Sequence, residues 1–124
     1  MTILEKLQIW ITALRSGKYI QGKDDLRSFA KDKDTPERFC CLGVLCDILD
    51  NTKWNKKLAG IYKENRWLYI DQGGYLPTKI REMVGLSTKE ENGLVLMNSA
   101  GKSFNEIANY IEMEILPRYL NDSR

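Results

Sequence analysis

Three cysteines are the side chains of this sequence best suited to chemistry. They are Cys40, Cys41 and Cys46, and they fall within seven consecutive residues. Adjacent cysteines do not form an ordinary disulfide, and a secreted scaffold of this length spreads more cysteines along the chain, so a reducing compartment is expected. A four-ligand zinc site would need Asp47 or a second chain to complete it. We predict three buried thiols and no metal site; the alternative is a thiol of lowered pKa at a helix N-terminus.

Histidine is absent from the sequence. Its absence excludes Cys–His and Ser–His–Asp nucleophilic schemes, and it excludes zinc sites that contain histidine. A Ser–Lys pair or a pair of carboxylates stays open as a catalytic arrangement. Because the sequence also has no phosphate-loop motif and no metal-ligand spacing, we expect a binding protein rather than an enzyme, with no cofactor.

A stretch rich in both cations and aromatic rings is the first candidate binding segment. Residues 53–66 include five basic residues and one acid, with Trp54 and Tyr62 inside the stretch and Trp67 directly after it. Cations beside flat aromatic rings suit an anionic, ring-bearing ligand, through phosphate contacts and base stacking. The alternative is a lysine-rich surface loop whose aromatic side chains pack on the first helix.

The second candidate segment, residues 15–23, has the order Arg-Ser-Gly-Lys-Tyr-Ile-Gln-Gly-Lys. This order is not the phosphate loop of nucleotide hydrolases, which needs Gly-Lys-Ser/Thr leading into a helix. Asp24 and Asp25 would repel a phosphate, but an anion contact stays open. We keep Arg27 in reserve because the two aspartates neutralise it. The predicted ligand-binding residues of both segments are Arg15, Lys18, Tyr19, Lys23, Lys63, Arg66 and Trp67.

The second segment follows the first predicted helix. Residues 3–16 place large apolar side chains on one helical stripe. Thr2 and Glu5 form a capping box before this stripe, and Gly17 can take the left-handed conformation that ends a helix. The pattern predicts a helix with a defined start and a defined end.

A polar loop and a central helix are predicted next. Residues 17–38 are polar and predict a loop with a short extended piece at 26–29. Residues 39–49 are apolar nearly all round, which is typical of a buried helix. Gly43 lowers the helix propensity of this segment by roughly 1 kcal/mol relative to alanine. We expect it to be there so that another stretch of backbone can approach closely.

Aromatic and β-branched residues predict a small hairpin after the central helix. Ile61-Tyr62 and residues 67–70 form its two extended runs, with a turn at 63–65 and a closing Gly73-Gly74. A two-stranded hairpin is marginally stable alone, so this one has to pack on the helices.

Three shorter helices are predicted in the C-terminal part. Pro77 opens the first of them and Gly85 ends it. Two Ser-x-x-Glu capping boxes start helices near 88–98 and 104–116, and Pro117 ends the last one.

Residues 94–111 have the pattern of the first half of a helix-turn-helix motif: an apolar helix, a glycine-containing turn and a second capped helix. A nucleic-acid-binding regulator is therefore the alternative function. The residues after 111 are acidic and apolar and lead into Pro117. Because acids repel phosphate, this composition favours packing over DNA binding.

The overall composition bounds the class of protein. The chain has 124 residues, 43% of them hydrophobic, and a formal net charge of +2. This fits one domain over residues 1–124 and is too apolar for a disordered chain. No secretory signal is visible, and no apolar stretch approaches the roughly 20 residues of a membrane span. We predict an α+β, mainly helical fold with four to five short helices packed with a small β-hairpin. We also predict a homo-oligomer, because the domain has two apolar-rich helices, one of them almost uniformly hydrophobic, that can share surface with a second copy.

Four segments carry a resemblance when they are taken together. They are residues 13–23, residues 39–47 with the string Phe-Cys-Cys-Leu-Gly-Val-Leu-Cys-Asp, Leu76-Pro77 and residues 101–108. In combination they resemble a family of small bacteriophage and prophage proteins of unassigned function. The resemblance implies a phage accessory protein in the cytoplasm of an infected bacterium, and it supplies no active site. We expect a host-takeover or antidefence factor that captures a nucleotide-like anion or a host protein.

Overall fold

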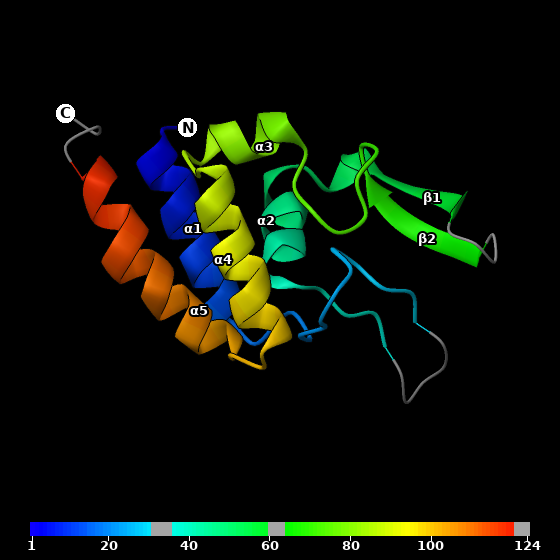
Figure 1. Cartoon of the computed structure of the whole chain (residues 1–124). Helices are drawn as coiled ribbons and strands as arrows, with labels where there is room; N and C mark the ends of the chain where they lie inside the picture. The colour runs from blue at the N-terminus through cyan, green and yellow to red at the C-terminus, as the bar shows by residue number, and fades with distance from the viewer. Residues whose placement is uncertain (31–35, 60–63, 121–124) are drawn as a thin grey trace.

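The computed structural model describes residues 1–30, 36–59 and 64–120. The helices gather on one side of the molecule and a hairpin projects from the other, which is the predicted α+β, mainly helical fold (Figure 1). No helix in the described ranges is long and apolar enough to cross a membrane. The described α-helices and strands are α1 (Ile3–Arg15), α2 (Cys41–Leu49), β1 (Trp54–Ala59), β2 (Glu64–Tyr69), α3 (Thr78–Met83), α4 (Thr88–Ser99) and α5 (Phe104–Tyr110).

Helix α1 begins and ends where the sequence predicts. The Glu5 amide donates to the Thr2 hydroxyl and the Thr2 amide donates to the Glu5 carboxylate, each at 3.1 Å, which completes the capping box. At the other end Gly17 takes a φ of 75°, in the left-handed region. The apolar stripe of α1 packs against α2 and α5.

Helix α2 is the buried centre of the fold, as predicted. Every residue from Cys41 to Cys46 is buried. A Cβ atom at Gly43 would overlap the carbonyl oxygen of Leu26, so the loop that precedes α2 passes directly against the helix at this glycine. The prediction that another backbone approaches Gly43 is confirmed.

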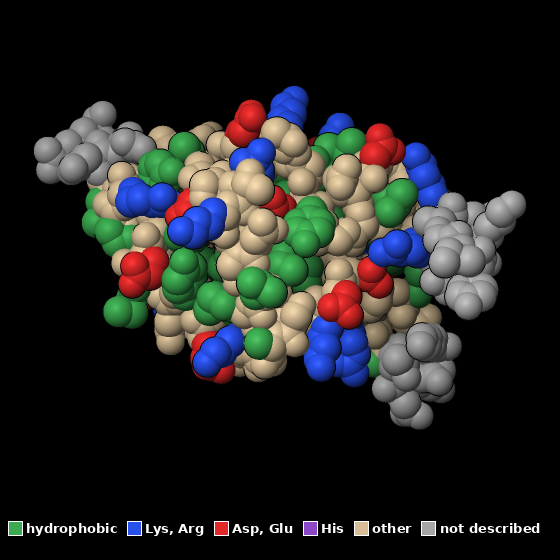
Figure 2. Space-filling view, viewed as in Figure 1, with side chains coloured by type: hydrophobic (Ala, Val, Ile, Leu, Met, Phe, Trp, Pro, Cys, Tyr) green, Lys and Arg blue, Asp and Glu red, His purple; other side chains and the backbone are tan. Residues whose placement is uncertain are grey.

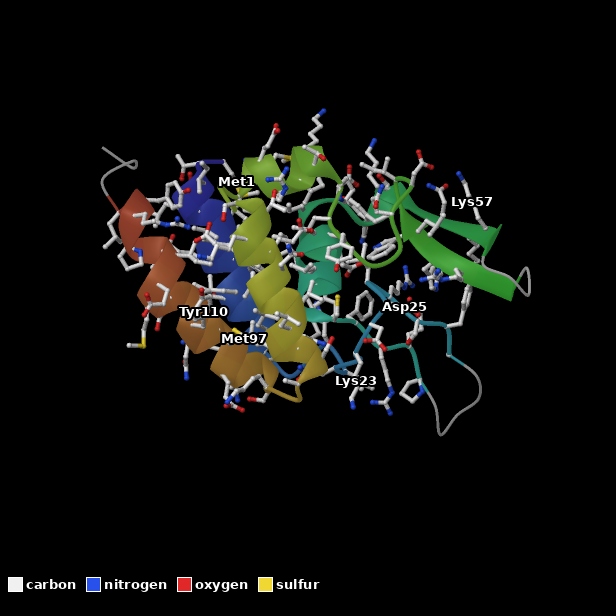
Figure 3. All side chains as sticks on the ribbon, in the orientation of Figure 1. Met1, Lys23, Asp25, Lys57, Met97 and Tyr110 are labelled. Atoms are coloured by element: carbon white, nitrogen blue, oxygen red, sulfur yellow. The ribbon has the colours of Figure 1, made fainter. Side chains whose placement is uncertain are left out.

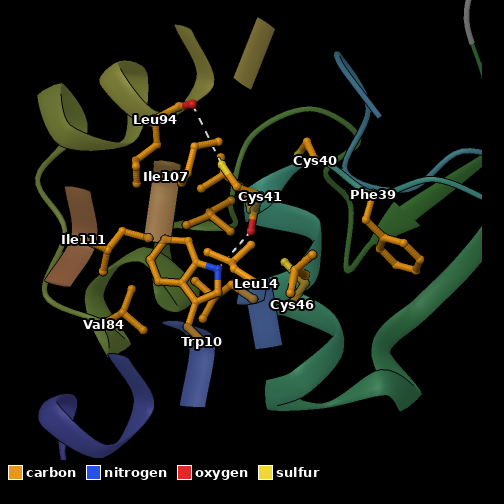
Figure 4. Packing of buried hydrophobic residues seen from close by; sticks show 14 of the residues in the cluster. Trp10, Leu14, Phe39, Cys40, Cys41, Cys46, Val84, Leu94, Ile107 and Ile111 are labelled. Carbon is orange, nitrogen blue, oxygen red and sulfur yellow. Dashed lines mark hydrogen bonds between the residues drawn. The ribbon is translucent and has the colours of Figure 1, made fainter. Parts of the chain in front are cut away.

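A single cluster of buried side chains joins α1, α2, α4 and α5. Trp10 is fully buried in it, and its indole nitrogen donates to the Cys41 carbonyl oxygen at 2.9 Å (Figure 4). The Cys41 thiol in turn donates to the Leu94 carbonyl oxygen at 3.8 Å. These two hydrogen bonds connect α1, α2 and α4 through the middle of the core.

A buried amide side chain fastens the loop between α1 and α2 to the helices. Asn98 of α4 is 1% exposed, and its oxygen accepts from the Cys41 amide at 3.1 Å and from the Gln21 side chain at 3.1 Å. Its nitrogen donates to the carbonyl oxygens of Gly22 at 2.7 Å and Lys23 at 3.1 Å. Because a buried polar group needs partners, these bonds fix the path of the loop.

The hairpin forms, but its first strand starts earlier than the sequence predicts. β1 begins at Trp54, and residues 64 and 65, predicted as part of the turn, belong to β2. Residues 61–63 lie outside the described part of the chain. Trp54 pairs with Tyr69 across the strands, and their rings meet edge to face at 5.0 Å. Aromatic cross-strand pairing of this kind stabilises one register. We infer that it outweighs the low strand propensity of Lys56 and Lys57 in β1.

The last helical segment continues beyond its predicted end. After α5 the chain forms a π-helical segment, η2 (Ile111–Ile115), and a 3-10 turn, η3 (Leu116–Tyr119). Pro117 stands in the first turn of η3, where a missing amide hydrogen costs no helical bond, so it does not end the run as predicted. A third short turn, η1 (Asn51–Lys53), links α2 to β1.

Candidate functional site

The predicted ligand-binding residues fall into two groups on different elements. Arg15 ends α1, and Lys18 and Tyr19 follow it in the loop. Arg66 and Trp67 lie on β2. The sequence analysis predicts that both groups contribute to one ligand site. A side chain can do so only if no other group of the chain already occupies it.

Lys23 and Lys63 complete the predicted set. Lys63 lies outside the described residues. Lys23 is exposed, and its labelled position in Figure 3 is at the lower edge of the molecule. Its carbonyl group is engaged by Asn98, whereas its ammonium group makes no ion pair with a described residue.

Arg15 is engaged by its own chain. Its guanidinium donates to both carboxylate oxygens of Glu112, at 3.0 and 3.1 Å, and to the Asn109 side chain at 2.7 Å. The hydrogen bonds from Arg15 hold the pKa of the Glu112 carboxyl below its usual value. Arg15 therefore joins α1 to the α5–η2 helix, and its fork is already filled by a carboxylate.

Arg66 and Arg27 are also paired with carboxylates. The Arg66 guanidinium lies 2.5 Å from Asp25. Arg27 donates to both oxygens of Glu37, at 2.7 and 3.0 Å. The expectation that Asp24 and Asp25 neutralise Arg27 is therefore wrong: Glu37 does so, and Asp25 neutralises Arg66 on the hairpin.

Six aromatic side chains form one set of ring contacts, which includes a member of each group of predicted residues. We call them the aromatic cluster: Tyr19, Phe29, Phe39, Trp54, Trp67 and Tyr69. Neighbouring ring centroids are between 5.0 and 6.3 Å apart, the range of favourable aromatic pairs. The cluster packs the hairpin on the loop that precedes α2, which is the support that a two-stranded sheet needs.

Trp67, predicted to stack on a ligand ring, is covered by groups of its own chain. The Arg27 guanidinium carbon lies 3.8 Å from the centroid of the Trp67 ring, and the Lys56 ammonium lies 4.9 Å from it. Phe29 stacks on the same indole with centroids 5.3 Å apart. The buried indole nitrogen has no hydrogen-bond partner among the described residues. A ligand ring would have to displace one of these groups.

Asp47 connects the aromatic cluster to α2. It accepts from the Tyr19 hydroxyl at 2.6 Å and from the Trp54 indole nitrogen at 3.0 Å. Burial, with the hydrogen bond to Asp47, raises the pKa of Tyr19, so the phenol stays neutral. Asp47 was the residue considered as a fourth zinc ligand, and within the described residues no group of three or more Cys, Asp or Glu is placed to hold a metal.

The three cysteines are buried free thiols, as predicted. Cys40 is the residue at the N-cap of α2, where backbone amides lower a thiol pKa. Burial outweighs these amides and raises the pKa of Cys40 to about 11. Burial also raises the pKa of Cys41 and of Cys46. Because the thiolate is the nucleophilic form, this arrangement disfavours a reactive cysteine at neutral pH.

A groove of about 500 Å³ runs along the outer face of α1. Apolar side chains from two helices, Ile9 and Ala13 of α1 and Ile48 of α2, line part of it. Lys18 and Tyr19 line it beyond the C-terminal end of α1, and Lys18 makes no ion pair with a described residue. We call this the α1 groove; its lining residues are Glu5, Gln8, Ile9, Thr12, Ala13, Ser16, Lys18, Tyr19 and Ile48.

The comparisons with known proteins yield a family. A protein-family model described as a domain of unknown function (DUF8296) matches residues 4–115. The chain belongs to this family. The description gives no activity, and no curated protein and no solved structure matches the chain.

In this DUF8296 chain, the sequence signals identified only part of the groove. Lys18 and Tyr19 were predicted as ligand residues, whereas Ile9 and Ile48 were not. Ile9 carried a usable signal, because it lies off the apolar stripe of the first helix and is 41% exposed. Ile48 is contributed by a helix far along the chain, so only the fold places it beside Ile9.

The helical pair considered for DNA binding is present, without a separate recognition helix in the described residues. α4 and α5 are joined by a turn at residues 100–103, and after Tyr110 the chain stays helical through η2 and η3. The exposed side chains of α5 and η2 include Glu106, Glu112 and Glu114, which would repel a phosphate backbone. Figure 2 shows basic and acidic side chains interspersed on this face rather than one basic patch.

Proposed function

We propose that the protein is a non-enzymatic binding protein that captures a small anionic, ring-bearing molecule, such as a nucleotide-like signal, in the α1 groove. The observation that carries the proposal is the groove itself. Its volume of about 500 Å³ falls within the range of small-molecule sites, which combine apolar lining with a few polar groups. The apolar side chains from α1 and α2 suit a ring, and Lys18 supplies a cation for the anionic group.

Ion pairs of the arginines with carboxylates reduce the number of predicted residues that can bind the ligand. Arg15 and Arg66 already hold carboxylates, and Trp67 is covered by Arg27 and Phe29. The proposal therefore uses Lys18 and the neutral Tyr19 from the predicted set. The high thiol pKa values support capture over covalent chemistry.

The biological part of the proposal comes from the resemblance to phage and prophage proteins. In this proposal the protein is encoded by a phage, acts in the cytoplasm of the infected host and serves host takeover or antidefence. Capture removes a signal by mass action, so the protein has to be made in amounts comparable with its ligand. Capture of a host protein instead of a small molecule is an outcome of the experiment below.

A ligand screen tests the proposed function. The purified protein is tested by thermal shift and calorimetry against cyclic nucleotides and ADP-ribose-type nucleotides, beside a DNA gel shift at two salt concentrations. We expect saturable, stoichiometric binding of a nucleotide and no turnover. A salt-sensitive DNA gel shift without nucleotide binding would favour the alternative function, a nucleic-acid-binding regulator. Turnover that one substitution abolishes would contradict a binding role.

Two matched pairs of variants test the site. Lys18→Ala should weaken nucleotide binding about tenfold, the effect of one charged hydrogen bond, while Lys89→Ala, at an exposed position of α4, should not. Ile9→Asp should weaken binding strongly, because it removes an apolar contact and adds a second negative charge to a groove that Glu5 already lines. Ile20→Asp is its control, since Ile20 is 43% exposed against 41% for Ile9 and does not line the groove. Equal affinities of the two variants within each pair would show that the ligand does not bind in the α1 groove.

A further inference from the structure

Two hollows meet between η1, the end of β2 and α3. The first is about 260 Å³ and is lined by apolar side chains that include Leu49, Ile80 and Met83. The second is about 430 Å³, is more polar, and includes Lys57, which Figure 3 labels at the upper edge of the molecule, the edge on which α3 lies. We call the joined hollows the lysine basin. The residues that line both are Lys53, Ile70 and Lys79.

Both acids at the basin are occupied by neighbouring groups. Asp71 pairs with the Lys57 ammonium at 3.2 Å. Asp50 accepts from the Thr52 hydroxyl at 2.5 Å and from the Thr52 amide at 3.0 Å, and these bonds hold the pKa of Asp50 below its usual value. The Asp71 carboxylate is therefore engaged by an ion pair, and the Asp50 carboxylate by hydrogen bonds.

The cations that remain are Lys53 and Lys79. Neither makes an ion pair with a described residue, and both line the two hollows. With Lys57 offset by Asp71, and Asp50 offsetting one further lysine, the basin carries one net positive charge. A single negative charge complements it, whereas a polyphosphate would leave charge uncompensated.

Ile70 lines both the apolar hollow and the polar one. Its backbone has a φ of 59°, in the left-handed region that a β-branched residue rarely adopts, and its side chain is 39% exposed. Backbone in this region occurs preferentially at active sites, ligand sites and switch regions. This conformation belongs to the turn after β2, in which the Ile70 amide donates to the Lys53 carbonyl oxygen at 3.1 Å, and Ile70 lines both hollows there.

We infer that the lysine basin binds an amphipathic monoanion. Its single charged group, a carboxylate or a phosphodiester, lies between Lys53 and Lys79, and its apolar chain or ring fills the smaller hollow against Ile70. This site goes beyond the proposed function, because it shares no lining residue with the α1 groove.

Titrations with three simple probes test the ligand class. Hexanoate has both the charge and the chain, hexan-1-ol lacks the charge, and acetate lacks the chain. We expect hexanoate to bind about a hundredfold more tightly than either partial probe, because two charged contacts contribute about tenfold each and the four additional methylenes of the chain contribute on the order of a hundredfold when buried. Amide shifts of the isotopically labelled protein should concentrate at 49–53, 69–71 and 79–83. Hexyl methyl phosphate carries a phosphodiester on a hexyl chain, and its affinity relative to hexanoate shows which of the two charged groups the basin prefers.

Lysine variants separate this site from the α1 groove. Lys53→Ala combined with Lys79→Ala should lower hexanoate affinity by about a hundredfold, tenfold for each charged contact. Lys89→Ala and Lys18→Ala should leave it unchanged. An unaltered affinity in the double variant, equal binding of hexan-1-ol, or amide shifts confined to the α1 groove would each overturn the inference. None of these results depends on whether a nucleotide binds along α1.

Discussion

Arginine and lysine have different roles on the surface of this protein. Five of the six described arginines are in ion pairs: Arg15–Glu112, Arg27–Glu37, Arg66–Asp25, Arg81–Glu91 and Arg118–Glu90. By contrast, Lys18, Lys53 and Lys79 make no ion pair within the described ranges. An ammonium is a compact point charge without the planar fork of a guanidinium. Both proposed sites therefore depend on one or two charges combined with apolar contact, rather than on bidentate recognition.

Ile70 supplies a prediction at the scale of one residue. We expect Ile70→Gly to be more stable than Ile70→Ala by roughly 0.5–1 kcal/mol in urea unfolding. The left-handed conformation costs a residue with a Cβ about 1–2 kcal/mol, whereas the greater chain entropy of glycine costs about 0.5–1 kcal/mol. Both variants lose the same apolar contacts beyond Cβ, so the comparison isolates the backbone.

Ile20 is the matched control for Ile70. It is 43% exposed against 39%, and its φ is not positive. Glycine should here be the less stable of the two substitutions, because only its entropy cost remains. The same order of stability at both positions would show that the conformation of Ile70 carries no strain.

At the scale of elements, the starts of three helices were predictable because they depend on sequence neighbours. The capping boxes that begin at Thr2, Ser87 and Ser103 all formed, each from residues three apart. The start of β1 was missed because it depends on Trp54 meeting Tyr69, a pairing across strands that local propensity does not register.

The candidate site was predicted less well than the helices, for a related reason. Sequence spacing identified Arg15 and Arg66 as cations but gave no information on their partners. Glu112 is 97 residues from Arg15, and Asp25 is 41 residues from Arg66. Only the folded chain shows that these carboxylates already occupy the guanidinium groups.

The contact between α2 and the preceding loop gives a prediction for a whole element. Gly43→Ala should destabilise the protein by about 2 kcal/mol or more, although alanine improves helix propensity by roughly 1 kcal/mol. The added methyl group would overlap the Leu26 carbonyl, so the loop would have to move away from the helix. Urea unfolding measures the loss.

Gly93 of α4 is the control for Gly43. No atom outside its chain neighbours and the local helix backbone lies within 4 Å of a Cβ built there. Gly93→Ala should therefore stabilise the protein by about 0.5–1 kcal/mol, the usual gain of alanine within a helix. Stabilisation by both substitutions would mean that α2 and the loop are not in close contact.

At the scale of the whole molecule, the apolar surface of α2 is covered by the same chain. Residues 41–46 are buried among α1, α4 and the loop before α2. This helix is the more apolar of the two apolar-rich helices on which the expectation of a homo-oligomer rests, and its residues 41–46 are not available to a second copy. The remaining large exposed apolar side chains include Leu96 of α4, at 68%, and Met113 of η2, at 71%. A homo-oligomer stays a prediction, with no surface assigned to it.

Stability at acid pH is a property of the whole molecule, because carboxyl groups with lowered pKa values lie on several elements. Hydrogen bonds hold the pKa values of these groups below their usual values: Glu5, Asp50, Glu106 and Glu112. When the pKa of an acid is lower in the folded state, the unfolded state binds more protons as the pH falls. The stabilisation is therefore complete above the ordinary carboxyl pKa and is lost as the pH falls through the lowered values.

Thermal unfolding between pH 7 and pH 2.5 tests this acid dependence, with Glu112→Gln as the informative variant. The parent protein should lose stability below about pH 4.5, where carboxyl groups begin to protonate. Glu112→Gln should be less stable than the parent at pH 7, because Arg15 loses its ionic partner, and the difference should shrink towards pH 2.5, where the parent has lost that partner too. Glu114→Gln is the control, since Glu114 is exposed and makes no ion pair within the described ranges, and its curve should follow the parent. A Glu112→Gln curve parallel to the parent throughout would mean that the Arg15–Glu112 contact between α1 and η2 contributes nothing to acid stability.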